Sequence, residues 1–102
     1  MKPVVVTLCG STKFKEAFIE ANATETMSGK IVLSVGGFDH AEGVVLTESQ
    51  REMLGKLHEH KIDMSDEILV LNVGCYIGDS TKHEIEYARK LGKSVRFLEK
   101  QS

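Results

Sequence analysis

Short apolar runs alternate along the chain with longer segments whose apolar residues recur at helical spacing. The runs are rich in β-branched residues and predict buried strands over about 4–8, 31–35, 68–73 and 94–98. The segments between them predict helices over about 13–27, 47–64 and 81–91. Strands and helices therefore alternate from one end of the chain to the other.

This alternation predicts an α/β domain with a parallel sheet, because each strand-helix-strand unit crosses over in the right-handed sense. We expect a single domain over 1–102, built as a three-layer sandwich of Rossmann-like or flavodoxin-like type. Its four parallel strands should lie in the order 2-1-3-4. The loops after the first and third strands then meet at the carboxyl edge of the sheet, where open α/β proteins bind ligands.

The predicted middle helix opens with the capping box Thr47-Glu48-Ser49-Gln50. Helical spacing predicts a buried face composed of Met53, Leu54, Leu57 and Ile62. His58 falls near the apolar side of this helix. A histidine in that place is more often a packing residue than a catalyst, and both interpretations stay open here.

Glu84 falls in the first turn of the predicted last helix, at the edge of a packing stripe formed by Thr81, Ala88 and Leu91. The stripe aims Glu84 at the crevice between the loops, where a partly shielded carboxylate can act as a nucleophile or a base. The spacing Thr81-x-x-Glu84 also fits a capping box, in which the acid only accepts a bond from an amide. Spacing alone favours the capping box.

Two polar loops form the expected walls of the ligand crevice. Their candidate binding residues are Cys9, Gly10, Ser11, Lys13 and Phe14 after the first strand, and Gly78, Asp79, Ser80 and Thr81 after the third. Backbone amides, hydroxyls and a lysine suit an anionic or sugar-bearing small molecule. Ser11 or Thr12 is also a predicted N-cap of the first helix.

A third loop, 36–43, carries Asp39, His40 and Glu42. These side chains suggest a metal site, but the absence of another ligand fixed by spacing favours a lid over the crevice. Asp63 and Asp66 fall between the middle helix and the third strand, and we expect them at the opposite edge of the sheet, away from chemistry.

The net charge of −2 gives no basic footprint, so no nucleic-acid partner is expected. No apolar run reaches the length of about 20 residues that spans a bilayer, and no secretion signal begins the chain. We therefore expect a cytoplasmic protein without a membrane partner. Its two cysteines, Cys9 and Cys75, are expected to be reduced thiols, with a redox or metal pair as the alternative.

At these positions the chain resembles the nucleoside 2-deoxyribosyltransferase-like superfamily, which includes 2′-deoxynucleoside 5′-monophosphate N-glycosidases. The resemblance rests on Cys9-Gly10-Ser11, on 62–66 and on 84–88, and it covers nearly the whole chain. It implies cleavage of an N-glycosidic bond, or deoxyribosyl transfer, on a nucleoside or nucleoside 5′-monophosphate. Glu84 would be the nucleophile that attacks the anomeric carbon. No metal or cofactor is implied, and the expected assembly is a homodimer.

The chain departs from the family pattern at two positions where members usually carry Asp: His58, eight residues before Asp66, and Gly78, six residues before Glu84. His58 thereby becomes the second candidate catalytic residue. Phe14, Phe38 or Tyr76 could stack on the base. The departures also support an alternative function, a non-catalytic module that binds a nucleotide or nucleotide sugar. A structural dimer without a ligand is the third interpretation.

Overall fold

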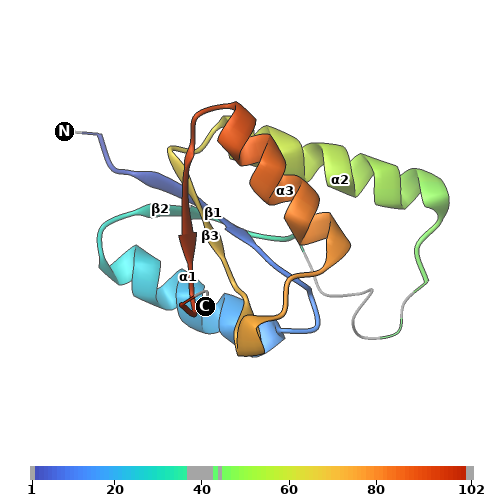
Figure 1. Ribbon diagram of the computed structural model, residues 1–102, viewed down its shortest axis with the longest axis horizontal. Coiled ribbons are helices and arrows are strands. Elements are labelled where there is room, and N and C mark those ends of the chain that lie inside the picture. Colours follow the sequence, from blue (N-terminus) through green and yellow to red (C-terminus); the bar gives the residue numbers. More distant parts are fainter. Residues whose placement is uncertain (1, 37–42, 44, 101–102) are drawn as a thin grey trace.

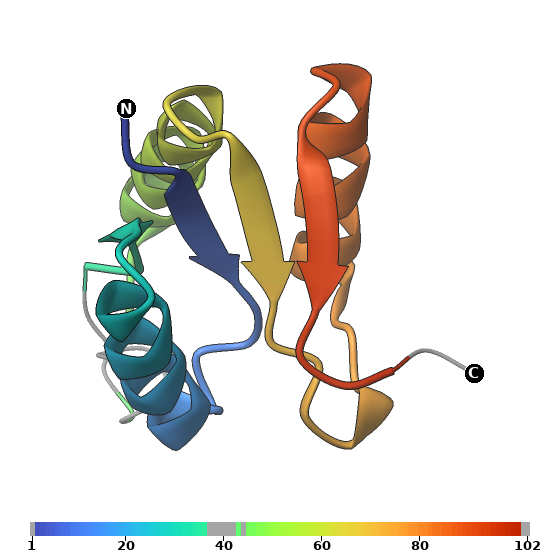
Figure 2. The same ribbon diagram turned by 90° about the vertical axis from the view of Figure 1, so that its left-hand side faces the viewer.

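A computed structural model describes residues 2–36, 43 and 45–100 of the chain. The elements follow one another as β1 (Val5–Cys9), α1 (Lys15–Met27), β2 (Ile31–Leu33), α2 (Glu48–Asp63), β3 (Glu67–Val70), the short 3-10 helix η1 (Val73–Cys75), α3 (Asp79–Lys90) and β4 (Ser94–Phe97). All the strand pairs are parallel, and the order β2-β1-β3-β4 confirms the predicted sheet (Figure 2). Within the described residues, no helix has the length and apolar character needed to cross a membrane.

The sheet is the middle of three layers, with α1 below it and α2 and α3 above it in Figure 1. Successive side chains of β1 point to opposite faces of the sheet. Val6 and Leu8 pack with Phe18 of α1, whereas Cys9 packs in a separate cluster with Ile62 of α2. Because β1 is buried on both faces, its run of apolar residues is what a central parallel strand requires.

The first helix begins at Lys15, later than predicted, and its N-cap is Phe14 rather than Ser11 or Thr12. The Phe14 amide donates to the Ser11 carbonyl oxygen at 3.0 Å, which closes a turn before the helix starts. The prediction of a side-chain cap was wrong because a tight turn, not a helix, directly follows β1. Ser11 and Thr12 therefore stay in the loop at the carboxyl edge.

The capping box of α2 is confirmed, with Thr47 and Gln50 bonded reciprocally. Its predicted buried face is largely wrong, because Met53, Leu54 and Leu57 are 51%, 43% and 48% exposed. Only the second half of the helix packs on the sheet, where Ile62 and His58 are its buried residues. The first half projects past the strands (Figure 1), and its apolar side chains are exposed.

Helix α3 packs through Thr81, Ile85 and Ala88, all of which are buried. The predicted stripe is therefore correct for Thr81 and Ala88. It is wrong for Leu91, the C-cap residue, which is 46% exposed. Ile85 takes the place of Leu91, because positions 81, 85 and 88 follow the helical spacing on one face.

The amino edge of the sheet holds the acids that were expected to lie away from the chemistry. The Asp66 carboxylate accepts a bond from the Val5 amide at 2.8 Å, and Asp63 accepts one from the Tyr87 hydroxyl at 2.7 Å. Both acids connect elements at this edge, which confirms the predicted placement. They fix the start of β3 and the junction of α2 with α3.

At the other edge, β1 and β3 end in close contact. A methyl group placed on Gly10 would lie 3.2 Å from both the Cβ atom and the carbonyl oxygen of Leu71. Such distances are shorter than ordinary van der Waals contacts, so a side chain at position 10 would push the two strand ends apart. Gly10 thus sets the spacing of the loops that follow them.

Replacement of Gly10 by Ala should destabilise the protein by about 1–3 kcal/mol, the usual cost of overpacking a tight contact. The matched control is Gly55→Ala within α2, where the added methyl group would meet no atom within 4 Å. That variant should be neutral or more stable, because Ala favours a helix interior by about 0.5–1 kcal/mol over Gly. Thermal unfolding measures the difference in stability between the two variants. Equal melting temperatures would contradict the claim that a side chain at position 10 clashes with Leu71.

Candidate functional site

A pocket of about 760 Å³ opens at the carboxyl edge of the sheet. One wall is the turn after β1, and a second is the loop that leads into α3 together with the first turns of that helix. The accessible first half of α2 supplies the third wall, including Leu54 and Leu57. These leucines therefore line a pocket rather than a core. Volumes of this size are typical of sites for small organic ligands.

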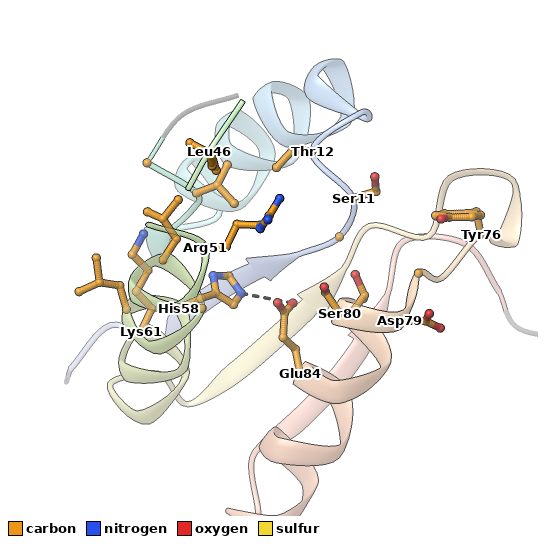
Figure 3. A pocket seen from close by; sticks show the side chains of 18 residues that line it. Ser11, Thr12, Leu46, Arg51, His58, Lys61, Tyr76, Asp79, Ser80 and Glu84 are labelled. Atoms are coloured by element: carbon orange, nitrogen blue, oxygen red, sulfur yellow. Dashed lines mark ion pairs between the residues drawn. The ribbon is translucent and has the colours of Figure 1, made fainter. Parts of the chain in front are cut away.

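Three side chains from separate elements converge at the floor of this pocket. The Nε2 atom of His58 on α2 lies 3.4 Å from Oε1 of Glu84 on α3 (Figure 3). The same Nε2 atom lies 3.3 Å from Sγ of Cys9, the last residue of β1. The cluster thus connects both helices of the upper layer to the central strand.

Glu84 does not form the capping box that its spacing suggested. Helix α3 begins at Asp79, its N-cap is Gly78, and no side-chain capping bond is present. Glu84 therefore falls in the second turn, not the first, and Thr81 is buried rather than at the cap. The Glu84 side chain is 20% exposed and lines the pocket, so its carboxylate is shielded yet reachable by a ligand.

The sequence left open whether His58 is a packing residue or a residue of the site, and the structure shows it in both places. Its side chain is only 11% exposed and packs against the sheet through the Cys9 thiol. It also lines the pocket and contacts the Glu84 carboxylate. An imidazole nitrogen in this position can hold the carboxylate in one orientation or carry a proton beside it.

Cys9 lies beneath the pocket rather than in its wall, and it is completely buried. Burial raises the pKa of its thiol well above the ordinary value, and the nearby Glu84 carboxylate raises that pKa further. The thiol therefore keeps its proton at neutral pH and is no nucleophile. Cys75 is exposed, and both cysteines are free thiols, as expected.

The structure brings most of the predicted binding residues to the pocket wall. These are Gly10, Ser11, Gly78, Asp79, Ser80 and Thr81. The Asp79 carboxylate points away from Glu84 in Figure 3, so it does not take the place of the acid expected, from the resemblance, at the position of Gly78.

Lys13 and Phe14 stand outside this wall and surround Tyr76 instead. The Lys13 ammonium lies 3.6 Å from the centroid of the Tyr76 ring, and the Phe14 ring meets Tyr76 edge to face at 5.8 Å. Tyr76 itself lines the pocket. Phe38 and the loop acids and histidine, Asp39, His40 and Glu42, fall outside the described residues.

The sequence analysis missed Arg51, which lines the pocket from the first turn of α2. Its side chain reaches across the opening toward the turn that carries Ser11 and Thr12 (Figure 3). Arg51 precedes His58 by seven residues, which is about two helical turns and places both on one face of α2. Arg51 could therefore have been predicted from its helical spacing relative to His58, if His58 had first been assigned to the site.

Lys61 lines the pocket too, but its ammonium donates to the Ser34 carbonyl oxygen at 2.6 Å. It therefore fastens α2 to the end of β2. Arg51 is left as the cation that reaches the opening from this helix.

No protein-family model matches the chain, and no curated relative was found for it.

The burial of Cys9 predicts unequal reactivity of the two thiols. A thiol-specific aromatic disulfide reagent should modify Cys75 rapidly in the folded protein at neutral pH. Cys9 should react only after unfolding, because it is buried and protonated. Cys75→Ser should abolish the rapid phase. Rapid modification of Cys9 in that variant would show that the cluster is open to solvent.

Proposed function

We propose that the protein cleaves the N-glycosidic bond of a nucleoside or nucleoside 5′-monophosphate, with Glu84 as the nucleophile. One observation carries the proposal: the Glu84 carboxylate stands at the floor of a pocket of nucleotide size, where it is partly shielded and contacts His58 at 3.4 Å. Shielding strengthens the interaction of a carboxylate with developing positive charge. The residue pattern that resembles the deoxyribosyltransferase-like superfamily adds the substrate class.

The reaction begins when a carboxylate oxygen of Glu84 attacks the anomeric carbon of the sugar. The carbon–nitrogen bond breaks, its electron pair goes to the base, and a glycosyl ester of Glu84 forms through an oxocarbenium-like state. Water, or the nitrogen of a second base, then attacks the same carbon, and the electron pair of the ester bond returns to the Glu84 carboxylate. The proton lost by the attacking group balances the one taken up by the released base. His58 holds the carboxylate in the attacking orientation through Nε2.

The other walls suit the rest of a nucleotide. Ser11 and Thr12 supply hydroxyls on one side of the pocket, and Arg51 supplies a positive charge that reaches toward them. Guanidinium groups bind phosphate oxygens through paired hydrogen bonds. We assign the 5′-phosphate to this part of the pocket, and the base to the apolar wall that contains Leu54 and Leu57.

A second candidate function is binding of the same ligands without cleavage. The contact between His58 and Glu84 favours it, because an imidazole nitrogen at 3.4 Å engages the same carboxylate oxygen that would have to attack the sugar. The orientation of Asp79 away from Glu84 also favours it, since a nearby second acid would help the base to leave (Figure 3). The two functions differ in whether the ligand is consumed.

Glu84→Gln should lower the rate of base release by about a thousandfold or more, because an amide cannot form the glycosyl ester. The assay incubates the protein with a panel of ribonucleosides, 2′-deoxyribonucleosides and their 5′-monophosphates, and separates free base by chromatography. The matched control is Glu86→Gln, a substitution of an exposed acid on the same helix, and it should retain full activity.

Activity that survives in Glu84→Gln would exclude Glu84 as the nucleophile. Binding is measured on the same panel by the shift in melting temperature. A compound that raises this temperature but is never cleaved by the original protein would favour the second candidate.

Arg51→Gln should raise the KM for a nucleoside 5′-monophosphate by about tenfold or more, since a hydrogen bond to a charged group contributes about 1.5–3 kcal/mol. The KM for the corresponding nucleoside should stay unchanged. Arg89→Gln, at the far end of α3, serves as the control for loss of charge. An equal rise in KM for the nucleoside and the nucleotide would contradict the assignment of the phosphate to this wall.

A further inference from the structure

The cluster of Cys9, His58 and Glu84 has a second chemical capacity that the proposed reaction does not use. One ligand atom from each side chain lies within 4.8 Å of the other two. The three atoms are a sulfur, an imidazole nitrogen and a carboxylate oxygen, which are the donor types that proteins use to bind zinc. The set comes from β1, α2 and α3, so the fold itself holds the donors together.

Two of the three distances between the ligand atoms match those of a tetrahedral zinc site, and the third is below 4.8 Å. Bond lengths of about 2.3 Å to sulfur and about 2.0–2.2 Å to nitrogen and oxygen place the ligand atoms of such a site about 3.4–3.6 Å apart. The cluster has 3.3 Å between Sγ and Nε2, and 3.4 Å between Nε2 and Oε1. An ion could therefore enter with little movement of the three side chains.

Charge also favours a divalent cation. Coordination displaces the proton of the Cys9 thiol to solvent, giving a thiolate beside the Glu84 carboxylate and a neutral His58. The two negative charges balance the charge of the ion, so the buried site is neutral as a whole, and a buried charge is tolerated when it is balanced in this way.

We infer that Cys9, His58 and Glu84 form a binding site for zinc, or for a divalent cation of similar preference for thiolate. His58 and Glu84 line the pocket, whereas Cys9 closes the site from below. The ion enters from the pocket, and its fourth coordination position faces the pocket, as in sites that accept water or a ligand. This inference does not rest on the proposed glycosidase function.

The test uses tag-free protein that has been treated with a chelator and then titrated with zinc by calorimetry. The expected result is one ion bound per chain. Titration with cobalt(II) should give the visible bands of a tetrahedral site together with a near-ultraviolet band from thiolate coordination. Cys9→Ser should abolish the thiolate band and lower zinc affinity by about tenfold or more, because even indirect contacts of a ligand change affinity by about 10–100-fold.

Cys75→Ser is the matched control, since it removes the exposed thiol and should leave both the band and the affinity unchanged. Glu84→Gln gives a second test that does not alter the buried thiol: zinc affinity should fall while the thiolate band remains. Circular dichroism of each variant verifies the fold. Absence of zinc binding by the original protein, or a thiolate band that survives in Cys9→Ser, would overturn the site. Either result leaves the glycosidase proposal to its own assay.

Discussion

The close approach of β1 and β3 at the carboxyl edge is the constraint on which the site depends. Gly10 permits it, because any side chain there would meet Leu71. With the two strand ends in contact, the turn after β1 and the loop before α3 become opposite walls of one pocket. The same contact brings Cys9 at the end of β1 under the helices that carry His58 and Glu84. The spacing of the backbone thus positions the three side chains of the cluster.

Much of the fold could be predicted from sequence, because burial on both faces leaves a distinctive apolar run for each central strand. The order of the strands was predicted as the one typical of a flavodoxin-like doubly wound sheet, and the structure confirms it. The face of α2 could not be predicted in the same way. Leu54 and Leu57 have the spacing of core residues, yet they line a pocket, and hydropathy does not distinguish the two environments.

Site residues that the topology brings together could be predicted from the sequence. Contacts that depend on how side chains pack could not. The loop residues Ser11 and Ser80 were expected in the wall because parallel strands carry their loops to one edge. The contact of His58 with Cys9 joins residues separated by 49 positions, and no local spacing encodes it. The resemblance pointed to His58, but only the structure shows that one nitrogen atom serves both Cys9 and Glu84.

The two proposals make competing demands on Glu84. A carboxylate that coordinates an ion cannot attack a sugar, so zinc would act as an inhibitor of the proposed reaction. His58 is shared as well, since Nε2 either orients Glu84 or binds the ion. If both proposals hold, a zinc ion bound by the cluster would control whether Glu84 is available as the nucleophile.

The central claim is that Glu84 forms a covalent bond with the sugar. It is tested most directly by intact-mass spectrometry after incubation with a 2′-fluorinated nucleoside analogue, whose electronegative substituent slows release of the glycosyl ester. The account predicts a mass increase of one fluorinated sugar, located on Glu84 by peptide mapping. Release of base without an adduct, or an adduct on another residue, would contradict it.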